Sequence, residues 1–383
     1  MNGESGGEGS RNQDFAGSGD SDSGIADLPT RFRRHALAIE RAGRSPLCVE
    51  LMRGSADDIE AGGYLATLIE SLPLPPGQAP ALRLLAALHR LVLEGRAPEL
   101  AAYYPDVGGE LQPAGAWKAA ERVLRANPVF MRDALGKGVQ TNEPGRSAVL
   151  FGVLLWITRV HAMPIRIREI GASAGLNLLV DRYAYQVHGS VLGDTHSSLL
   201  IEEPWIGLPV DDPARAQQDL FVSERRGCDV APIDATSDQG KLTLLSYIWP
   251  DEPRRLDRMR AALEVADREK PSVDRVPAEK WLDEVLRSGN EGAVTLVWQS
   301  VFWQYLTDRA KSEILTTIEA AGERSDESAP LSYVRMEPEV GTTHAFVVTA
   351  TMWPGGESHV LATCGDHGPP VRWAAVDIGS GKS

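Results

Sequence analysis

The chain has 383 residues, with 39 Lys and Arg against 53 Asp and Glu, which gives a formal net charge of −14 at pH 7. This length excludes a small disulfide-stabilised scaffold and permits one large domain or two. The negative charge opposes long-range attraction to nucleic acid or anionic lipid. We therefore expect a small-molecule substrate, and neither a nucleic acid nor a membrane as partner. The composition leaves the oligomeric state open.

The N-terminal residues 1–29 contain six acidic residues, one basic residue and many Gly and Ser. Such a segment buries too little apolar surface to offset the entropy cost of ordering it. We predict a disordered acidic tail there and a short disordered segment at 377–383. Subtracting the tail's charge of −5 from −14 leaves about −9, so the remainder is still acidic.

Targeting signals and metal motifs are not evident in the sequence. The start lacks the charged and apolar runs of a secretory signal, and no segment reaches the roughly 20 apolar residues of a membrane span. The three cysteines are far apart in the sequence, and the histidines form no cluster with metal-ligand spacing. We expect a cytoplasmic protein without a bound metal.

The rest of the chain shows two different patterns of apolar residues. Residues 30–158 carry apolar residues at helical spacing, punctuated by Pro and Gly, which predicts an all-helical N-terminal region. From residue 159 to 376, short β-branched runs alternate with helical stretches, which is typical of parallel β-α-β units with both faces of the sheet covered. The predicted fold class is α/β.

Two hairpins are also predicted in this second region. One has its turn at Gly193–Asp194 and pairs residues 185–188 with 198–201. The other has its turn at Pro354–Gly356 and pairs residues 345–352 with 359–363, which closes a mostly parallel sheet with antiparallel strands.

A glycine-containing loop follows the strand predicted at Ile165–Ile170. Gly171, Ser173 and Gly175 come directly after the strand, and a helix is predicted to begin near Leu176. Glycines at such a turn let backbone N–H groups approach a ligand closely, as nucleotide-type cofactors require. The alternative is that these glycines serve only the geometry of the turn. The dinucleotide fingerprint Gly-x-Gly-x-x-Gly fails at two of its three positions, which disfavours NAD.

The pattern Glu169-x-Gly-x-Ser-x-Gly175 resembles instead the first motif of class I S-adenosylmethionine-dependent methyltransferases. The resemblance implies a Rossmann-like methyltransferase-type sheet, a loop that holds the methionine part of the cofactor, and an acid at Glu169 that orients it. It also implies that Asn177 helps to frame the pocket.

A second acid follows the next predicted strand. Asp229 stands before Pro232, as the ribose-binding acid of that family often does, although an acid that caps its own turn fits equally well. A further apolar strand starting at Ala293 ends in polar side chains, where open α/β sheets bind ligands. From it we name four pocket candidates: Gln299, Ser300, Gln304 and Tyr305. Ordinary packing is the alternative for the aromatic residues of this segment.

Polar residues also precede the apolar helix predicted at 148–158. Asn142, Glu143 and Arg146 are candidates for the pocket mouth, with helix capping around Pro144 as the alternative. His367 is either a general base or a terminal cap.

Six segments together resemble the bacterial domain of unknown function 2332 family: 140–146, 169–177, 226–234, 248–251, 299–305 and 367–373. The resemblance spans nearly all of residues 30–375 and brings no established reaction. The chain departs from the expected pattern at Arg275–Ala278, where an acid that meets the adenine is missing.

The sequence thus favours a methyltransferase that uses S-adenosylmethionine and acts on an unidentified small molecule, with the helical region as a lid. The alternative is a methyltransferase-like protein without catalysis that binds a ligand or a partner.

Overall fold

The computed structural model describes residues 27–70, 72, 79–287, 291–339 and 345–374. The predicted tail up to residue 26 and the segment 377–383 lie outside these residues. The helix α1 (Leu28–Arg41) begins two residues inside the segment 1–29 that was predicted to be a tail, and Leu28 is buried.

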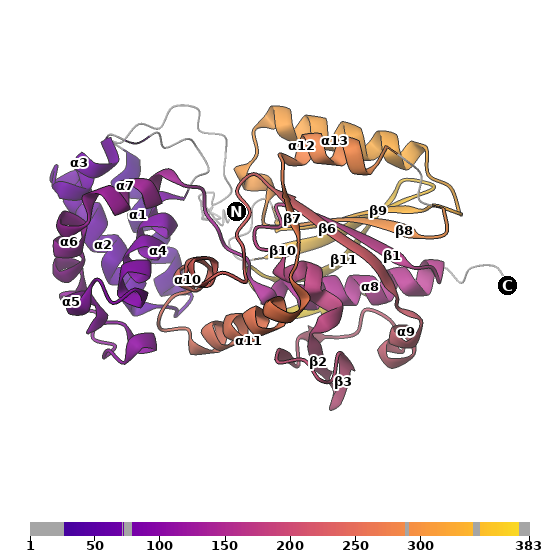
Figure 1. Cartoon of the computed structure of the whole chain (residues 1–383), viewed down its shortest axis with the longest axis horizontal. Coiled ribbons are helices and arrows are strands. Elements are labelled where there is room, and N and C mark those ends of the chain that lie inside the picture. The colour runs from indigo at the N-terminus through magenta and orange to yellow at the C-terminus, as the bar shows by residue number, and fades with distance from the viewer. Residues whose placement is uncertain (1–26, 71, 73–78, 288–290, 340–344, 375–383) are drawn as a thin grey trace, which may run out of the picture.

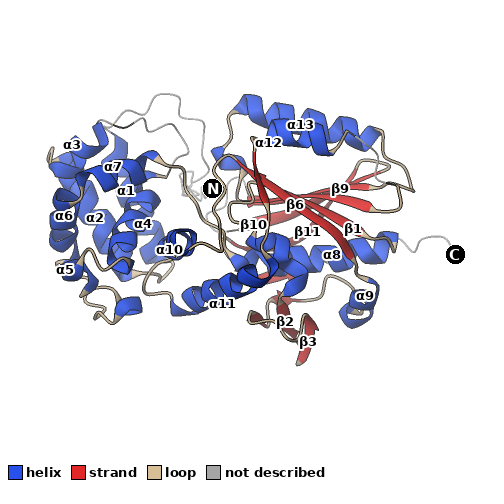
Figure 2. Cartoon of the chain, in the orientation of Figure 1, coloured by secondary structure: helices blue, strands red, loops and turns tan. Residues whose placement is uncertain are grey.

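The N-terminal part is helical, as predicted (Figures 1 and 2). Proline occupies the first helical position of several of these helices, where its missing N–H costs nothing. Their apolar faces form one core of residues between Leu28 and Leu135. The elements after α1 are α2 (Pro46–Glu60), α3 (Tyr64–Glu70), α4 (Pro80–Leu93), α5 (Pro98–Ala101), η2 (Pro105–Val107), α6 (Ala116–Ala126) and α7 (Pro128–Gly136).

The helix α8 (Ser147–His161), which follows η3 (Pro144–Arg146), is apolar almost all round and packs in a second core with the sheet. By packing, it belongs to the α/β part, so the boundary expected at 158 lies before Ser147 instead. Gly152 makes this possible, because a Cβ atom there would overlap the indole of Trp373.

A nine-stranded mixed sheet forms the centre of the α/β part, in the order β5-β12-β11-β10-β9-β8-β1-β6-β7. The five strands from β9 to β7 run parallel, and β9 to β12 pair antiparallel. The strands are β1 (Ile165–Ile170), β5 (Trp205–Ile206), β6 (Val222–Asp229), β7 (Val273–Arg275), β8 (Val294–Ser300), β9 (Leu331–Pro338), β10 (Phe346–Trp353), β11 (Glu357–Gly365) and β12 (Gly368–Trp373). The hairpin predicted around Pro354–Gly356 is confirmed.

Helices cover both faces of this sheet (Figure 1). The helices α8 and α11 (Pro253–Glu269) pack on one face, while α12 (Ala278–Val285) and α13 (Asp308–Glu323) pack on the other. Alternate residues of β8 serve the two faces: Leu296 and Trp298 join one core, and Val297 joins the other. Two more helices are α9 (Pro213–Asp219) and α10 (Asp238–Ser246), the second of which contacts α4.

The other predicted hairpin is wrong in its turn. The turn lies at His188–Gly189, where β2 (Ala184–Val187) pairs antiparallel with β3 (Ser190–Gly193), and both turn residues have positive φ. The second predicted partner, β4 (Leu200–Glu202), pairs with β2 in parallel. Gly193 instead packs against the backbone of Tyr183, because a Cβ atom at Gly193 would overlap the Tyr183 carbonyl oxygen.

Candidate functional site

The glycine loop lies at the carboxyl end of β1, between β6 and β8. The parallel strands follow the chain order outward from β1 in both directions, so β1 is the point at which the strand order reverses. Open α/β sheets bind ligands outside the carboxyl ends of their strands at such a point. The topology therefore marks this edge of the sheet for a ligand.

The loop is held in a left-handed backbone conformation. Gly171, Ser173 and Gly175 have φ of 69°, 51° and 73°. The Ala172 N–H donates to the Cys228 carbonyl at 3.0 Å, and the Gly175 N–H donates to the Ala172 carbonyl at 2.8 Å. The loop is therefore fixed by its own turn and by β6 before any ligand arrives.

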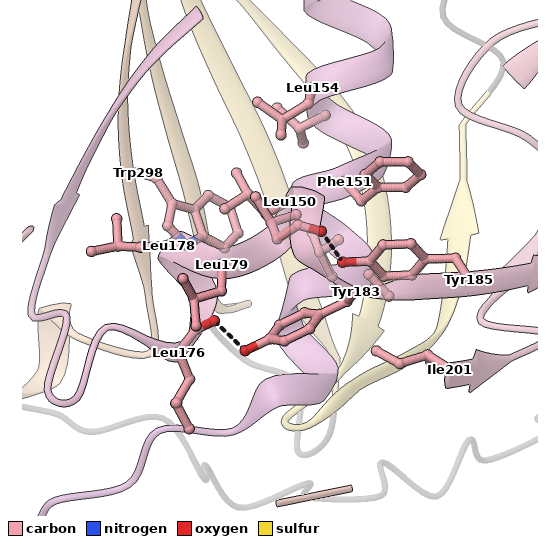
Figure 3. Close-up of a cluster of buried hydrophobic side chains, with 14 of the residues drawn as sticks. Leu150, Phe151, Leu154, Leu176, Leu178, Leu179, Tyr183, Tyr185, Ile201 and Trp298 are labelled. Atoms are coloured by element: carbon pink, nitrogen blue, oxygen red, sulfur yellow. Dashed lines mark hydrogen bonds between the residues drawn. The ribbon is translucent and has the colours of Figure 1, made fainter. Parts of the chain in front are cut away.

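The element after the loop is a short 3-10 helix, η4 (Leu176–Arg182), and the expected α-helix is absent there. The Tyr183 hydroxyl donates to the Leu176 carbonyl at 2.7 Å, as Figure 3 shows. This bond takes an oxygen that an α-helix would use, and Tyr183 then leads directly into β2. A dipole of a long helix is not available to a ligand at this loop.

Three predicted site residues support the loop. The Asn142 side-chain oxygen accepts from the Leu176 N–H at 2.9 Å, and the Ser173 hydroxyl donates to Gln140 at 2.9 Å. Asp229 accepts from the Ser173 N–H at 3.0 Å through one carboxylate oxygen and from the Ala231 N–H at 2.9 Å through the other. Asp229 therefore caps its own turn and ties it to the glycine loop.

Two other predicted residues have buried oxygens that lack a partner. Glu169 is 2% exposed and Asn177 is 1% exposed. Within the described residues, no hydrogen bond reaches Oε2 of Glu169 or Oδ1 of Asn177, although the Trp298 indole lies near the Glu169 carboxylate. Burial raises the pKa of Glu169 to about 8, and the nearby Arg146 offsets only part of this effect. We call Glu169 and Asn177 the loop acceptors.

Arg146 and Gln299 lie beside this edge and are buried. The Arg146 guanidinium donates to the Asp366 carbonyl at 3.0 Å and to the Ser300 carbonyl at 3.4 Å. Gln299 is fully buried, with its amide N–H donating to Glu337 at 2.8 Å and its oxygen accepting from the Tyr333 hydroxyl at 2.8 Å. Gln299 thus joins β8 to β9, and its amide has little hydrogen-bonding capacity left for a ligand.

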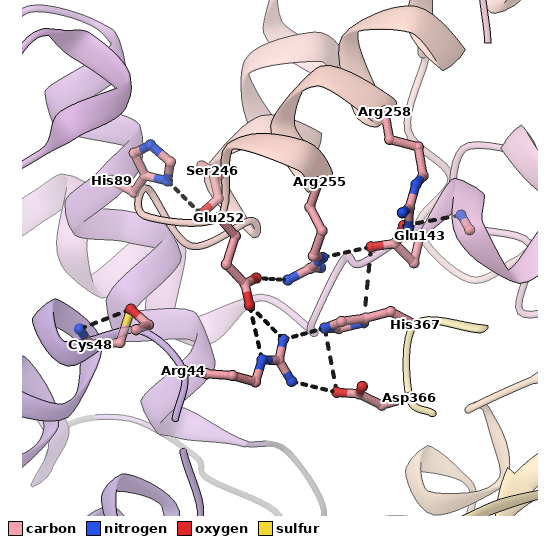
Figure 4. A network of polar contacts seen from close by, with 12 residues as sticks. Arg44, Cys48, His89, Glu143, Ser246, Glu252, Arg255, Arg258, Asp366 and His367 are labelled. Atoms are coloured by element: carbon pink, nitrogen blue, oxygen red, sulfur yellow. Dashed lines mark hydrogen bonds and ion pairs between the residues drawn. The ribbon is translucent and has the colours of Figure 1, made fainter. Parts of the chain in front are cut away.

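The other candidates are placed elsewhere. Gln304 and Tyr305 are exposed in the short 3-10 helix η5 (Trp303–Tyr305), and Ser300 is half-buried. Glu143 turns away from the loop: it accepts from Arg255 at 2.8 Å, from Arg258 at 3.2 Å and from the Gly145 N–H at 3.0 Å (Figure 4). These contacts hold the pKa of Glu143 well below its usual range, despite burial.

Glu143 belongs to a network of charges at the junction of the helical and α/β parts. We call it the junction network; its members are Arg44, Glu143, Glu252, Arg255, Arg258, Asp366 and His367 (Figure 4). The Arg44 guanidinium lies 2.6 Å from Nε2 of His367, so this nitrogen acts as the acceptor. His367, for which the sequence allows a general base or a terminal cap, is part of this network.

Sequence reasoning missed two residues at the loop. Glu337 is the last residue but one of β9, accepts from the Gln299 amide and is half-buried. Phe302 packs its ring against Gly171, since a Cβ atom at Gly171 would overlap it. A polar residue at the carboxyl end of a parallel strand was a usable signal for Glu337, whereas nothing local in the sequence indicates the contact of Phe302.

Two hollows of about 790 and 420 Å³ lie on the helical part, one beside Tyr103 and Arg122 and the other beside Arg44 and Arg53. The described ranges contain no group of three or more His, Cys, Asp or Glu that could hold a metal. Within the same ranges, no helix is both long enough and apolar enough to cross a membrane.

Comparison with known proteins places the chain in a family. Residues 30–373 match the model of the family described as "uncharacterized protein conserved in bacteria", DUF2332, and the chain belongs to it. No curated protein and no solved structure matches the chain.

Proposed function

We propose that this chain is a cytoplasmic S-adenosylmethionine-dependent methyltransferase of Rossmann-like type that acts on a small molecule. The strand order supports this reading: five parallel strands place the glycine loop at the reversal point, and antiparallel strands complete the sheet. This is the arrangement that the resemblance in the loop sequence implies.

The observation that carries the proposal is the pair of loop acceptors. Buried polar groups in proteins are nearly always hydrogen-bonded, so two oxygens without a partner among the described residues, one at the end of β1 and one at the start of η4, call for a donor. An ammonium group is a suitable donor, and the methionine part of S-adenosylmethionine carries one. Glu169 and Asn177 would hold this end of the cofactor, with Asn142, Ser173 and Asp229 fixing the loop beneath it.

The cofactor itself supplies the reactive methyl sulfonium, so the chain's task is to bind and orient both reactants and to exclude water. A dedicated nucleophile is not required. The net charge of −14 disfavours a polyanionic acceptor, which supports a small molecule as substrate.

Two observations favour the second candidate, a methyltransferase-like protein that binds a ligand or a partner without catalysis. The ring of Phe302 occupies the space against Gly171, and both carboxylate oxygens of Asp229 already accept bonds from the chain. A protein without catalytic activity would tolerate a loop whose binding groups are covered or bonded by its own residues.

Calorimetric titration with S-adenosylmethionine separates these readings at their first step. We expect a saturable heat with the wild-type protein, a loss of at least tenfold in affinity in Glu169→Gln, and no change in Glu264→Gln. Glu264 is an exposed glutamate on α11 and serves as the matched control. Absence of saturable heat at millimolar ligand overturns the proposal.

Methyl transfer is then sought with the protein and a panel of small amines, alcohols and thiols, with S-adenosylhomocysteine measured as the shared product. Binding without product across the panel favours the second candidate.

A further inference from the structure

The segment after β8 crosses over the glycine loop. From Val301 to Tyr305 the chain leaves the sheet, and Phe302 places its ring against the Cα atom of Gly171. Gly171 is the first residue after β1, at the point where the strand order reverses. The ring therefore stands where a ligand that uses the glycine backbone would have to approach.

Glu337 holds this segment in place. Its Oε1 accepts from the backbone N–H of Phe302 at 3.0 Å and of Trp303 at 3.2 Å, and from the Gln299 amide at 2.8 Å. Bonds to a charged acceptor are stronger than bonds between neutral groups. Within the described ranges, Oε2 of the same carboxylate is buried and has no hydrogen-bond partner. The carboxylate thus anchors the two residues that close the loop.

The anchored conformation is strained at its first residue. Val301 has φ of 53°, while its N–H donates to the Met336 carbonyl at 2.9 Å. A β-branched residue rarely adopts positive φ, and such strain persists only where the surroundings impose it. Opening of the segment would release this strain, whereas the bonds to Glu337 oppose opening.

We propose that Val301–Tyr305 is a gate over the glycine loop, with Phe302 as its plug and Glu337 as the positioning residue that latches it. The identity of the ligand behind the gate rests on the proposed function, while the gate itself does not. A ligand that binds only the open state has its affinity reduced by the fraction of molecules that are open. Weakening the latch or removing the plug therefore raises the apparent affinity.

The first test compares binding of S-adenosylmethionine by calorimetry. We expect Phe302→Ala to bind at least tenfold more tightly than the wild type and Glu337→Gln at least threefold more tightly. Two controls are Phe221→Ala, which alters a phenylalanine that is 62% exposed, and Glu357→Gln, which alters an exposed glutamate of the same sheet. Both controls should match the wild type. Affinity in Phe302→Ala that is equal to or weaker than that of the wild type overturns the gate.

The second test needs no ligand. Hydrogen exchange followed by mass spectrometry should show faster exchange of the Phe302 and Trp303 amides in Glu337→Gln and of the 301–306 peptide in Phe302→Ala, with β1 and β8 unchanged. A merely structural role for Glu337 predicts faster exchange throughout the sheet, and that result overturns the latch. If no variant binds S-adenosylmethionine, the proposed function fails, and exchange alone decides the gate: local acceleration supports it, and unchanged exchange overturns it.

Discussion

The junction network and the loop acceptors are both buried and polar, yet they differ in how their charges are paired. In the junction network, Glu143 accepts bonds from two guanidinium groups and a backbone N–H. At the glycine loop, Glu169 is equally buried and has Arg146 nearby, but no described residue makes a hydrogen bond to its Oε2.

This difference separates groups that hold the fold from groups that await a ligand. A buried charge is tolerated when opposite charges and hydrogen bonds replace its water. Where such partners are missing, the pKa of the buried group shifts and the folded protein loses stability. Residues of this kind are typical of functional sites, where a ligand can supply the missing partner. Burial alone does not distinguish the two cases, whereas the partners of each oxygen do.

Replacement of Glu143 should give the largest loss of stability. Glu143→Gln leaves Arg255 and Arg258 without their shared carboxylate, which we expect to lower the free energy of unfolding by about 4 kcal/mol. Urea unfolding at pH 7 measures the effect. The control Asp283→Asn removes an exposed partner of Arg287 and should cost less than about 1 kcal/mol. Equal effects of the two variants would contradict the account of the junction network.

At the glycine loop, replacement of the buried glutamate should raise the stability instead of lowering it. The folded-state pKa of Glu169 is raised from 4.5 to about 8. Its contribution to the stability of the fold is therefore complete below pH 4.5 and is lost progressively as the pH rises to about 8. Glu169→Gln carries no such charge and should exceed the wild type in stability by about 4 kcal/mol at pH 8, since each unit by which the pKa is raised is worth about 1.4 kcal/mol and Glu169 is half-ionised at that pH. The stability difference between variant and wild type should shrink toward pH 4.5.

Urea unfolding from pH 5 to 9 checks this pH dependence, with Glu264→Gln as control. A Glu169→Gln variant that is less stable than the wild type at pH 8 would show that the carboxylate is satisfied within the fold.

His367 gives the junction network a sensitivity to acid. Burial and the nearby Arg255 lower the pKa of His367 from 6.5 to about 4, although Glu143 acts in the opposite direction. Its contribution to stability is therefore present above pH 6.5 and is lost as the pH falls toward 4. In His367→Asn this acid-dependent loss should shrink by about 2 kcal/mol. Thermal unfolding across this range checks it, and His196→Asn, in which an exposed histidine is changed, should behave as the wild type does.

The smallest effect concerns the support of the loop. Asn142→Ala removes the acceptor of the Leu176 N–H, which should cost about 1 kcal/mol, the usual net value of a hydrogen bond. The side chain of Asn127 accepts from Arg96 at the surface, so Asn127→Ala should cost less. Thermal unfolding of both variants measures the difference, and a larger loss in Asn127→Ala would be evidence against the capping role of Asn142.

The features that the sequence predicted correctly are those with local signals. The strand that contains Glu169 was found because isoleucines recur along Ile165–Ile170, and the last hairpin because its turn is Pro-Gly-Gly. The family was recognised from short segments spread over most of the chain.

The features that it missed depend on contacts between distant residues. The expected α-helix after Gly175 is replaced by η4, where the Tyr183 hydroxyl bonds the Leu176 carbonyl. Glu143 was expected at the pocket, but its cationic partners stand more than 100 residues away in sequence, on α11. Phe302 meets Gly171 only because β8 lies beside β1.

Hydrogen exchange with and without millimolar S-adenosylmethionine shows whether the loop acceptors form a ligand site. We predict slower exchange in the peptides covering residues 169–177 and 229–231 when the ligand is present, and no such change in Glu169→Gln. Exchange that is unaltered at the glycine loop, or protection confined to the junction network and the helical part, would contradict the account.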